Sequence, residues 1–240
     1  MLTAHELYKT YGERTVVRGV SFAVQPGEIV GLLGQNGAGK TTSFDMVVGI
    51  VRPDGGSVQL NGHELGQLPI HERAKLGLGY LPQEASAFRT LSVEDNIRLF
   101  WEINQVPSAE QDRRLEALLN EFDIAHLRRS RAVSLSGGER RRLEIARALA
   151  QDPVYLLLDE PFTGVDPIAI TELQLIVRQL LQRRRIGILL TDHNPKATLA
   201  ITDRAYILQE GRILVGGSAQ ELAANELARR YYLGEDFVLR

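Results

Sequence analysis

The stretch that most constrains this 240-residue chain runs from Gly34 to Thr42 and reads GQNGAGKTT. An apolar run at 29–33 precedes it, and the apolar positions of a helix follow it. The pattern G-x-x-x-x-G-K-[ST] between a strand and a helix is that of a phosphate-binding loop. Its glycines let the backbone curl so that N–H groups point at phosphate oxygens, and the helix dipole adds positive charge there. The stretch therefore predicts a nucleoside triphosphate site.

Two side chains of this loop carry chemistry of their own. The Lys40 ammonium reaches β- and γ-phosphates in such sites, and the Thr41 hydroxyl is a ligand for Mg²⁺. The alternative is a glycine-rich turn with a stray lysine, which leaves the strand before it and the helix after it unexplained. We therefore expect ATP and Mg²⁺ as the bound groups.

Composition limits the other function classes. The chain is 44% hydrophobic and 24% charged, with 28 basic and 30 acidic residues, so we expect no nucleic-acid partner. It has no cysteine, which excludes disulfides and thiolate metal sites. No apolar run approaches the ~20 residues of a transmembrane helix, and residues 1–9 lack a signal-peptide core. We expect a cytoplasmic protein with no direct membrane insertion, which reaches a membrane only by docking on another chain.

The element pattern predicts an α/β protein with an insertion. Residues 3–24 contain β-formers around a glycine turn, which predicts antiparallel strands ahead of a parallel core. The pattern within 84–150 is mostly helical. We expect a single domain in which 1–83 and 151–240 form a catalytic core, a mostly parallel sheet with helices, preceded by an N-terminal antiparallel β subdomain and interrupted by a helical subdomain.

Carboxylates follow one of the predicted parallel strands. Asp159 and Glu160 come directly after the apolar run at 154–158. In α/β folds ligands bind at the carboxyl ends of parallel strands. Asp159 fits a Mg²⁺-associated position and Glu160 could accept a proton from water; the alternative is a solvated turn. His193 follows the apolar strand at 186–190, at the same predicted edge.

Two further features leave alternatives open. Tyr11, at the first glycine turn, is either a half-buried strand residue or a flat platform for adenine. Residues 135–139 read LSGGE, in which Ser136 and Glu139 fit a capping box that would simply start a helix. The two glycines between them are poor helix formers, and they would let a phosphate approach the backbone. We expect the arginines at 140–142 to form a solvated helix face.

The motifs in this order resemble the ATP-binding subunits of ABC transporters across essentially the whole chain. They are the phosphate loop at 34–42, a glutamine loop at Gln83, the LSGGE signature at 135–139, the VYLLLDE strand at 154–160, the loop at 164–166 and His193. The N-K-x-D motif of GTPases is absent. The signature sequence is specific to this family, which favours the phosphate-binding interpretation of LSGGE.

The resemblance extends to the ATPase subunits of lipopolysaccharide export in Gram-negative bacteria. It is carried by YLPQEAS at 80–86, TDHN at 191–194 and YLGEDF at 232–237. The chain departs from the usual pattern at Gln35, where proline is usual, at Ser43 and Asp45 in the first helix, and at Thr163, where alanine is common. None of these changes removes a catalytic group.

This resemblance implies a cytoplasmic ATPase, peripheral on the inner membrane, that powers lipopolysaccharide export through separate transmembrane subunits. It implies a homodimer stacked head to tail, with each ATP between one phosphate loop and the other copy's signature. The alternatives are the ATPase of another ABC transporter, such as a nutrient importer, and a soluble ABC ATPase acting on DNA or ribosomes. The soluble class typically has two cassettes or a long coiled coil, which this chain lacks.

The resemblance also implies roles for individual residues. The catalytic ones are Glu160 as general base, His193 on the γ-phosphate, Gln83 on the γ-phosphate or the attacking water, and Lys40. The metal-associated ones are Thr41, Gln83 and Asp159. The nucleotide contacts are Tyr11, Asn36, Gly37, Ala38, Gly39, Lys40, Thr41 and Thr42 and, from the second copy, Ser136, Gly137 and Gly138. The 84–96 segment would meet the membrane subunits, with Phe88 as a candidate anchor.

Overall fold

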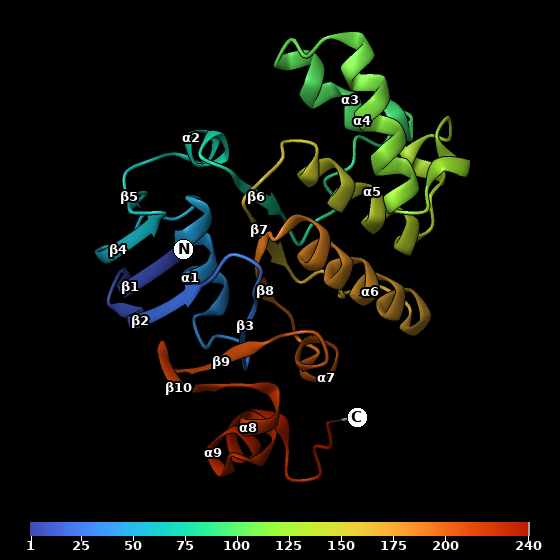
Figure 1. Cartoon of the computed structure of the whole chain (residues 1–240). Helices are drawn as coiled ribbons and strands as arrows, with labels where there is room; N and C mark the ends of the chain where they lie inside the picture. The colour runs from blue at the N-terminus through green and yellow to red at the C-terminus, as the bar shows by residue number, and fades with distance from the viewer. Residues whose placement is uncertain (240) are drawn as a thin grey trace.

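Two sheets organise the chain, described here for residues 1–239 from a computed structural model (Figure 1). The larger sheet has six strands in the order β10-β9-β3-β8-β7-β6, and all neighbours are parallel except β9 and β10. Its strands are β3 (Ile29–Gly34), β6 (Leu78–Leu81), β7 (Tyr155–Asp159), β8 (Gly187–Thr191), β9 (Arg204–Gln209) and β10 (Arg212–Gly217). This sheet confirms the predicted α/β class.

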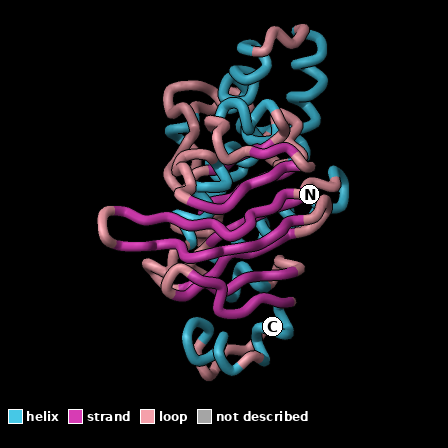
Figure 2. The backbone as a smooth tube through the Cα atoms, turned by 90° about the vertical axis from the view of Figure 1, so that its left-hand side faces the viewer, coloured by secondary structure: helices cyan, strands magenta, loops and turns pink. Residues whose placement is uncertain are grey.

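The smaller sheet is antiparallel, with strand order β2-β1-β4-β5. Its strands are β1 (Leu2–Tyr11), β2 (Arg14–Val24), β4 (Gly55–Leu60) and β5 (His63–Glu64). Strands β4 and β5 follow the phosphate loop in the chain. They join this sheet because β4 pairs with the edge of β1 that β2 leaves free, with Leu2 opposite Leu60. Figure 2 shows the long β1–β2 hairpin extending beyond the rest of the sheets.

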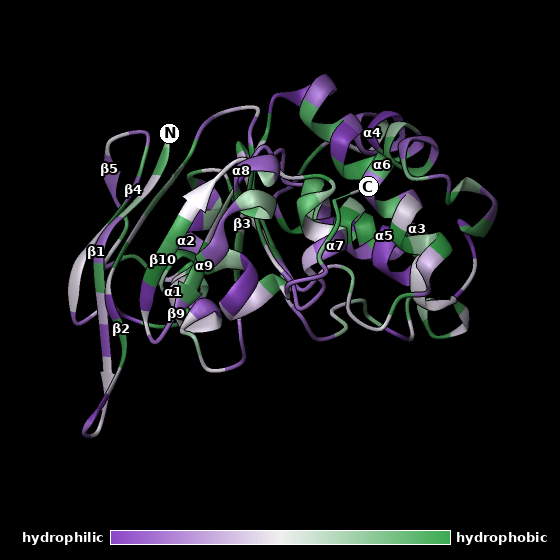
Figure 3. Cartoon of the chain, turned by 90° about the horizontal axis from the view of Figure 1, so that it is seen from below, coloured by the Kyte–Doolittle hydropathy of each residue, from purple (hydrophilic) through white to green (hydrophobic). Residues whose placement is uncertain are grey.

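Burial explains why the two sheets have different sequence patterns. Buried and exposed residues are mixed along β1 and β2, and Figure 3 shows hydrophilic and hydrophobic segments interspersed along these strands. Every residue of β3, β7 and β8 is buried. Such strands are covered on both faces and read as unbroken apolar runs. Helix α1 (Lys40–Val48) shares one apolar cluster with strands of both sheets, through Phe44, Met46 and Val47.

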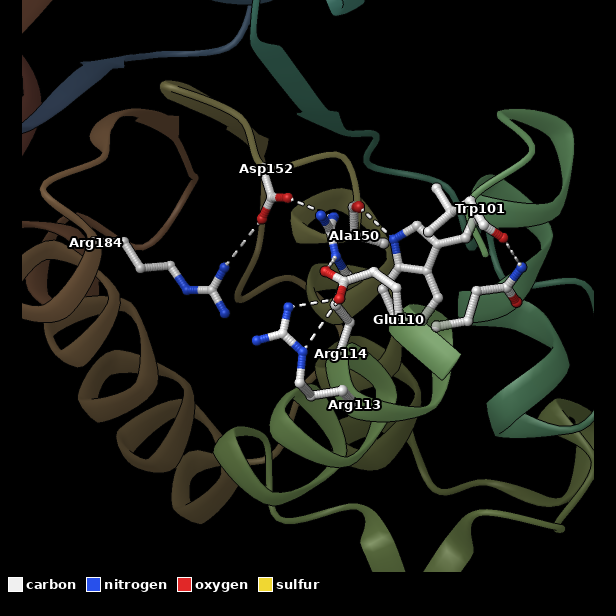
Figure 4. Close-up of polar contacts among 9 residues, drawn as sticks. Trp101, Glu110, Arg113, Arg114, Ala150, Asp152 and Arg184 are labelled. Carbon is white, nitrogen blue, oxygen red and sulfur yellow. Dashed lines mark hydrogen bonds and ion pairs between the residues drawn. The ribbon is translucent and has the colours of Figure 1, made fainter. Parts of the chain in front are cut away.

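The helical insertion consists of α3 (Val93–Ile103), α4 (Ser108–Glu121) and α5 (Gly137–Leu149), with two short 3₁₀ turns. Helix α3 starts at Ser92, whose hydroxyl accepts from the N–H of Asp95. Trp101 is 3% exposed and donates its indole N–H to the Ala150 carbonyl at 2.7 Å. Figure 4 shows this bond beside the ion pairs that Asp152 makes with Arg114 and Arg184. Helices α3 and α4 are thereby fixed to the segment that follows α5, and this segment is joined to α6.

The remaining helices precede or follow the strands of the larger sheet in the chain. They are α2 (Ile70–Lys75), α6 (Pro167–Arg184), α7 (Pro195–Leu199), α8 (Ala219–Ala224) and α9 (Glu226–Ala228), which continues into a π-helical turn at Arg229–Leu233. The carboxyl ends of β3, β7 and β8 meet at one edge of the sheet because these strands are parallel neighbours. Among residues 1–239, no helix has the length and apolar character needed to cross a bilayer.

A buried arginine completes the end of α1. Arg73 in α2 is 1% exposed, and its guanidinium donates to the carbonyls of Met46 at 2.7 Å, Val47 at 2.6 Å and Leu68 at 2.8 Å. The last carbonyls of a helix have no partner within it. Burial lowers the pKa of Arg73 to about 10, which leaves the side chain charged at neutral pH.

We therefore expect Arg73→Met to destabilise the protein by about 3 kcal/mol, because buried carbonyls lose charged donors. Urea unfolding at pH 7 measures this effect. Arg52→Met is the matched control, since Arg52 is exposed, and its free energy of unfolding should stay within about 0.5 kcal/mol of the original chain. Equal stabilities of the two variants would show that Arg73 does not secure α1.

Candidate active site

The phosphate loop connects β3 to α1 and needs its glycines. Gly37 and Gly39 have φ angles of 79° and 98°, a region that favours glycine. A Cβ on Gly39 would lie 2.9 Å from the Val16 carbonyl oxygen. The loop is braced from the far side, where the N–H of Gly211 donates to the Ala38 carbonyl at 3.0 Å. Strand β2 and the turn between β9 and β10 thus pack closely against the loop and leave no room for a side chain on Gly39.

Lys40 lies across this loop. Its ammonium donates to the carbonyls of Gly34 at 2.7 Å and Gln35 at 3.1 Å, and the residue is 4% exposed. Burial lowers the pKa of Lys40, while the charges of Glu160 and Asp159 raise it. The structure therefore places a buried cation between the loop and both carboxylates.

Asp159 and Glu160 are each 5% exposed, which excludes the solvated turn. Burial, then the charges of Asp45 and Glu160, raise the pKa of Asp159 to about 6. The Arg141 charge opposes this shift. No hydrogen bond formed within residues 1–239 ends on the Asp159 carboxylate. A buried carboxylate without hydrogen bonds is unfavourable, and a cation at this position would compensate it.

Glu160 is the point where three polar side chains meet. One oxygen, Oε2, accepts from Gln83 Nε2 at 2.8 Å and from Thr163 Oγ1 at 3.1 Å. The other, Oε1, lies 2.5 Å from His193 Nε2. The φ angle of Glu160 is 46°, in the left-handed region where a non-glycine residue is strained. The structure thus brings the predicted residues Gln83, Glu160 and His193 together.

Asp192 joins the two loops that carry these groups. Its Oδ2 accepts from the N–H of Phe162, and its Oδ1 from the N–H of Asn194, both at 2.9 Å. The N–H of Glu160 donates to the Thr191 carbonyl at 2.8 Å. Burial raises the pKa of Asp192. These bonds fix the ends of β7 and β8 relative to each other.

The expectation of a solvated arginine face is wrong for Arg141, which is 6% exposed. Its guanidinium donates to four backbone carbonyls, those of Pro82, Asp159, Glu160 and Pro161, and pairs with Glu144 at 3.1 Å. The burial of Arg141 has one signal in the sequence, which is helical spacing. Arg141 lies four residues before the buried Ile145 and therefore on the same face of α5. Glu144 in turn accepts from the N–H groups of Ser86 and Ala87.

The signature forms the capping box that starts α5. Ser136 accepts from the N–H of Glu139, and the Glu139 carboxylate accepts from the N–H of Ser136. A Cβ on Gly138 would lie 2.9 Å from the Ala169 side chain, so close packing on α6 accounts for this glycine. Ser136 and Gly137 are exposed, and within residues 1–239 no hydrogen bond joins them to the phosphate loop. Phosphate binding by the signature stays a prediction.

Tyr11 is the last residue of β1 and is 50% exposed, which agrees with the half-buried strand residue. The Lys9 ammonium lies 5.4 Å from its ring centroid. The nearby cavity of about 260 Å³ is lined by Arg14 and by residues 35–38 of the phosphate loop, without Tyr11. Stacking of Tyr11 on adenine stays a prediction, as do the nucleotide contacts of Asn36, Gly37, Ala38, Thr41 and Thr42.

Comparison with known proteins identifies the class. The ABC transporter family profile matches residues 17–163, and the chain belongs to this family of ATP-binding cassettes, as its sequence predicts. It is an ABC-type ATPase. An ATP-binding cassette of an ABC transporter, solved in its ADP conformation, has the same fold with a TM-score of 0.87 over 98% of this chain and 99% of the other, at 23% identity.

Several curated proteins have a higher sequence identity to this chain than that solved structure has. The lipopolysaccharide export system ATP-binding protein LptB of Escherichia coli K12 is 53% identical over 99% of both chains. LptB of Acidithiobacillus ferridurans is 52% identical over 99% of this chain and 98% of its own. An uncharacterised ABC transporter ATP-binding protein of Rhizobium meliloti is 54% identical over 99% of this chain and 88% of its own.

The raised pKa of Asp159 makes a prediction about stability. The ordinary aspartate pKa is 3.8, against about 6 in the fold. As pH rises between these values, the unfolded chain releases the proton more readily than the folded protein, so the free energy of unfolding falls. It stays reduced above pH 6. Asp159→Asn should therefore stabilise the nucleotide-free protein at pH 7 by roughly 3 kcal/mol, a gain that disappears as pH falls to about 4.

Urea unfolding at several pH values, with a metal chelator, measures this difference. Asp236→Asn is the control, because Asp236 is exposed, and its stability should follow the original chain at each pH. A less stable Asp159→Asn protein at pH 7 would contradict the assignment of Asp159 as an uncompensated buried charge.

Proposed function

We propose that this chain is the ATP-hydrolysing subunit of a lipopolysaccharide exporter. The observation that carries the catalytic part is the contact of Glu160 with Gln83 and His193 beside the phosphate loop. The transported substrate follows from the identity of about half of all residues with LptB proteins over nearly the full length.

The donors present fit a magnesium nucleotide. Asp159 offers a carboxylate without hydrogen bonds, and Thr41 offers a hydroxyl at the start of α1. Residues 1–239 contain no group of three or more acidic, histidine or cysteine side chains that could hold a metal, so phosphate and water oxygens would complete the shell. When bound, Mg²⁺ neutralises phosphate charge. Because the amide N–H of Gln83 donates to Glu160, its amide oxygen remains available to the metal ion or its water ligands.

The remaining groups act on the γ-phosphate and water. Lys40 and the N–H groups of 36–42 hold the phosphates. Glu160 takes the proton of the attacking water, in an orientation set by its hydrogen bonds. His193 turns its Nε2 from Glu160 to the γ-phosphate when nucleotide is present, which its 46% exposed side chain permits.

Replacing the base tests this assignment. Glu160→Gln keeps the size and the hydrogen-bonding ends of the side chain but cannot accept the proton. We expect ATP binding to persist and turnover to fall by about 10²–10⁴-fold, with the ATP-bound protein accumulating as a dimer. Steady-state hydrolysis and gel filtration with ATP are the measurements. Glu102→Gln, at an exposed site in α3, should leave both unchanged. Undiminished turnover in Glu160→Gln would remove Glu160 as the base.

The second half of the site is proposed to come from another copy of the chain. Ser136 and Gly137 are exposed at the N-terminus of α5, where free N–H groups attract anions. In a head-to-tail homodimer these residues and Gly138 would contact the γ-phosphate bound by the partner's loop. One structural neighbour, at 22% identity, was solved as a dimer with ADP and phosphate.

A groove on the helical side is proposed to receive transmembrane subunits, which would hold the chain on the cytoplasmic face of the inner membrane. The groove has a volume of about 220 Å³ and is lined by residues that include Ile70, Tyr80 and Phe100. Phe88 is 46% exposed, and the Arg147 guanidinium lies 4.9 Å from its ring centroid. Asn96 fixes the Phe88 backbone from both sides, at 2.8 Å and 3.1 Å.

We expect Phe88→Ala to reduce co-purification of the membrane subunits by at least tenfold while hydrolysis by the isolated chain stays intact. An apolar anchor contributes more than 1 kcal/mol to such interfaces, and Phe88 lies at the side of the groove, against Arg147, which lines it. Ile103→Ala is the control, because Ile103 is 71% exposed on α3 and should not change co-purification. Unchanged recovery with Phe88→Ala would contradict docking at this groove. Recovery of permeases other than lipopolysaccharide exporters would favour another ABC transporter.

A further inference from the structure

Thr163 contacts the carboxylate of Glu160 from the turn that follows it, and the mechanism proposed above does not use this contact. Its hydroxyl donates to Glu160 Oε2 at 3.1 Å. Glu160 itself is 5% exposed, whereas Thr163 lies at the exposed side of the turn. Within residues 1–239 the Thr163 hydroxyl makes no other hydrogen bond. The hydroxyl is therefore committed to the carboxylate.

The backbone holds these two side chains together. The N–H of Thr163 donates to the Glu160 carbonyl at 3.2 Å, which closes a tight turn. Within this turn the N–H of Phe162 is bound by Asp192, and Arg141 holds the carbonyls of Glu160 and Pro161. The turn therefore has little freedom, and the Thr163 hydroxyl stays within reach of Glu160.

The other two contacts of the carboxylate come from separate loops. Gln83 follows β6 and His193 follows β8, and the proposed mechanism turns His193 from Glu160 to the nucleotide. The Thr163 bond does not depend on either loop, because it is formed within the turn that carries Glu160. A glutamate side chain has several rotatable bonds, and its orientation during proton transfer must be fixed by such contacts.

We propose that Thr163 is a positioning residue that holds Oε2 of Glu160 and thereby presents the carboxylate to the attacking water. This inference rests on the proposed role of Glu160 as general base. Thr163 acts through Glu160 and is not among the residues proposed to hold nucleotide or metal. Its contribution is therefore to kcat and not to nucleotide affinity, and it depends on the hydroxyl and not on side-chain volume.

Three substitutions in the full chain separate these properties. Thr163→Ala removes the side chain, Thr163→Val keeps its shape without the hydroxyl, and Thr163→Ser keeps the hydroxyl. We expect kcat to fall about fivefold in the first two, since a lost charged hydrogen bond is only partly replaced by water. Thr163→Ser should restore kcat to within about twofold. The KM for ATP and the thermal midpoint should stay unchanged in all three, because Thr163 is exposed.

Two results of the kcat measurements would contradict the role of the Thr163 hydroxyl. Full kcat in Thr163→Val, or loss of kcat in Thr163→Ser equal to that in Thr163→Ala, would overturn the proposal. A parallel rise of KM would do the same, because it would indicate a contact with nucleotide.

The general-base assignment is tested separately in the same series. Wild-type turnover in Glu160→Gln would show that the proposed function of Glu160 is wrong. Loss of turnover in Glu160→Gln with full kcat in Thr163→Val would overturn only the role of Thr163. Combining Thr163→Ala with Glu160→Gln should lower the residual rate no further than Glu160→Gln alone, since the hydroxyl acts through the carboxylate.

Discussion

The buried guanidinium of Arg141 is the interaction on which the geometry of the site depends. It belongs to α5 of the helical insertion, yet four of its acceptors are carbonyls of the core, before Gln83 and around Asp159 and Glu160. Hydrogen bonds to a charged donor are each worth about 1.5–3 kcal/mol, and Glu144 supplies the counter-charge. A buried arginine stabilises the fold only while all of its hydrogen-bond and ionic partners are present. The loops that carry the catalytic groups therefore cannot shift independently of the insertion.

This connection also explains how the nucleotide site relates to the proposed docking groove. Glu144, the ionic partner of Arg141, accepts the backbone N–H groups of Ser86 and Ala87, which lead to Phe88. Arg147, one turn further along α5, lies over the Phe88 ring. One helix face thus contacts both the ends of the catalytic strands and the segment beside the groove. A rigid helix with partners at both sites provides a physical path for coupling, whose energy is for experiment to measure.

Much of the site could be predicted because its residues follow apolar strands. Asp159 and Glu160 come directly after such a run and His193 three residues after another, and parallel neighbouring strands end at a common edge. Arg141 could not be predicted as buried, because its partners are backbone carbonyls that leave no trace in sequence, and charged residues are usually exposed. The contact of Thr163 with Glu160 depends on a left-handed φ that sequence does not reveal for glutamate. The pairing of β1 with β4 likewise depends on which strand edge is free.

The same site shows why a phosphate loop alone does not define this molecule. The charges of Asp45, Glu160 and Asp192 each raise the pKa of Asp159, and burial makes ionisation of Asp159 and Asp192 costly. The charge of Arg141 opposes the shift at Asp159, whereas the Lys40 ammonium is itself bound to loop carbonyls. The nucleotide-free site is therefore electrostatically unfavourable for its own fold. A ligand that brings a divalent cation relieves this repulsion, so part of its binding free energy comes from strain already present in the protein. In the proposed homodimer, the exposed signature of a second copy would supply further N–H donors to the anionic phosphates that accompany the cation.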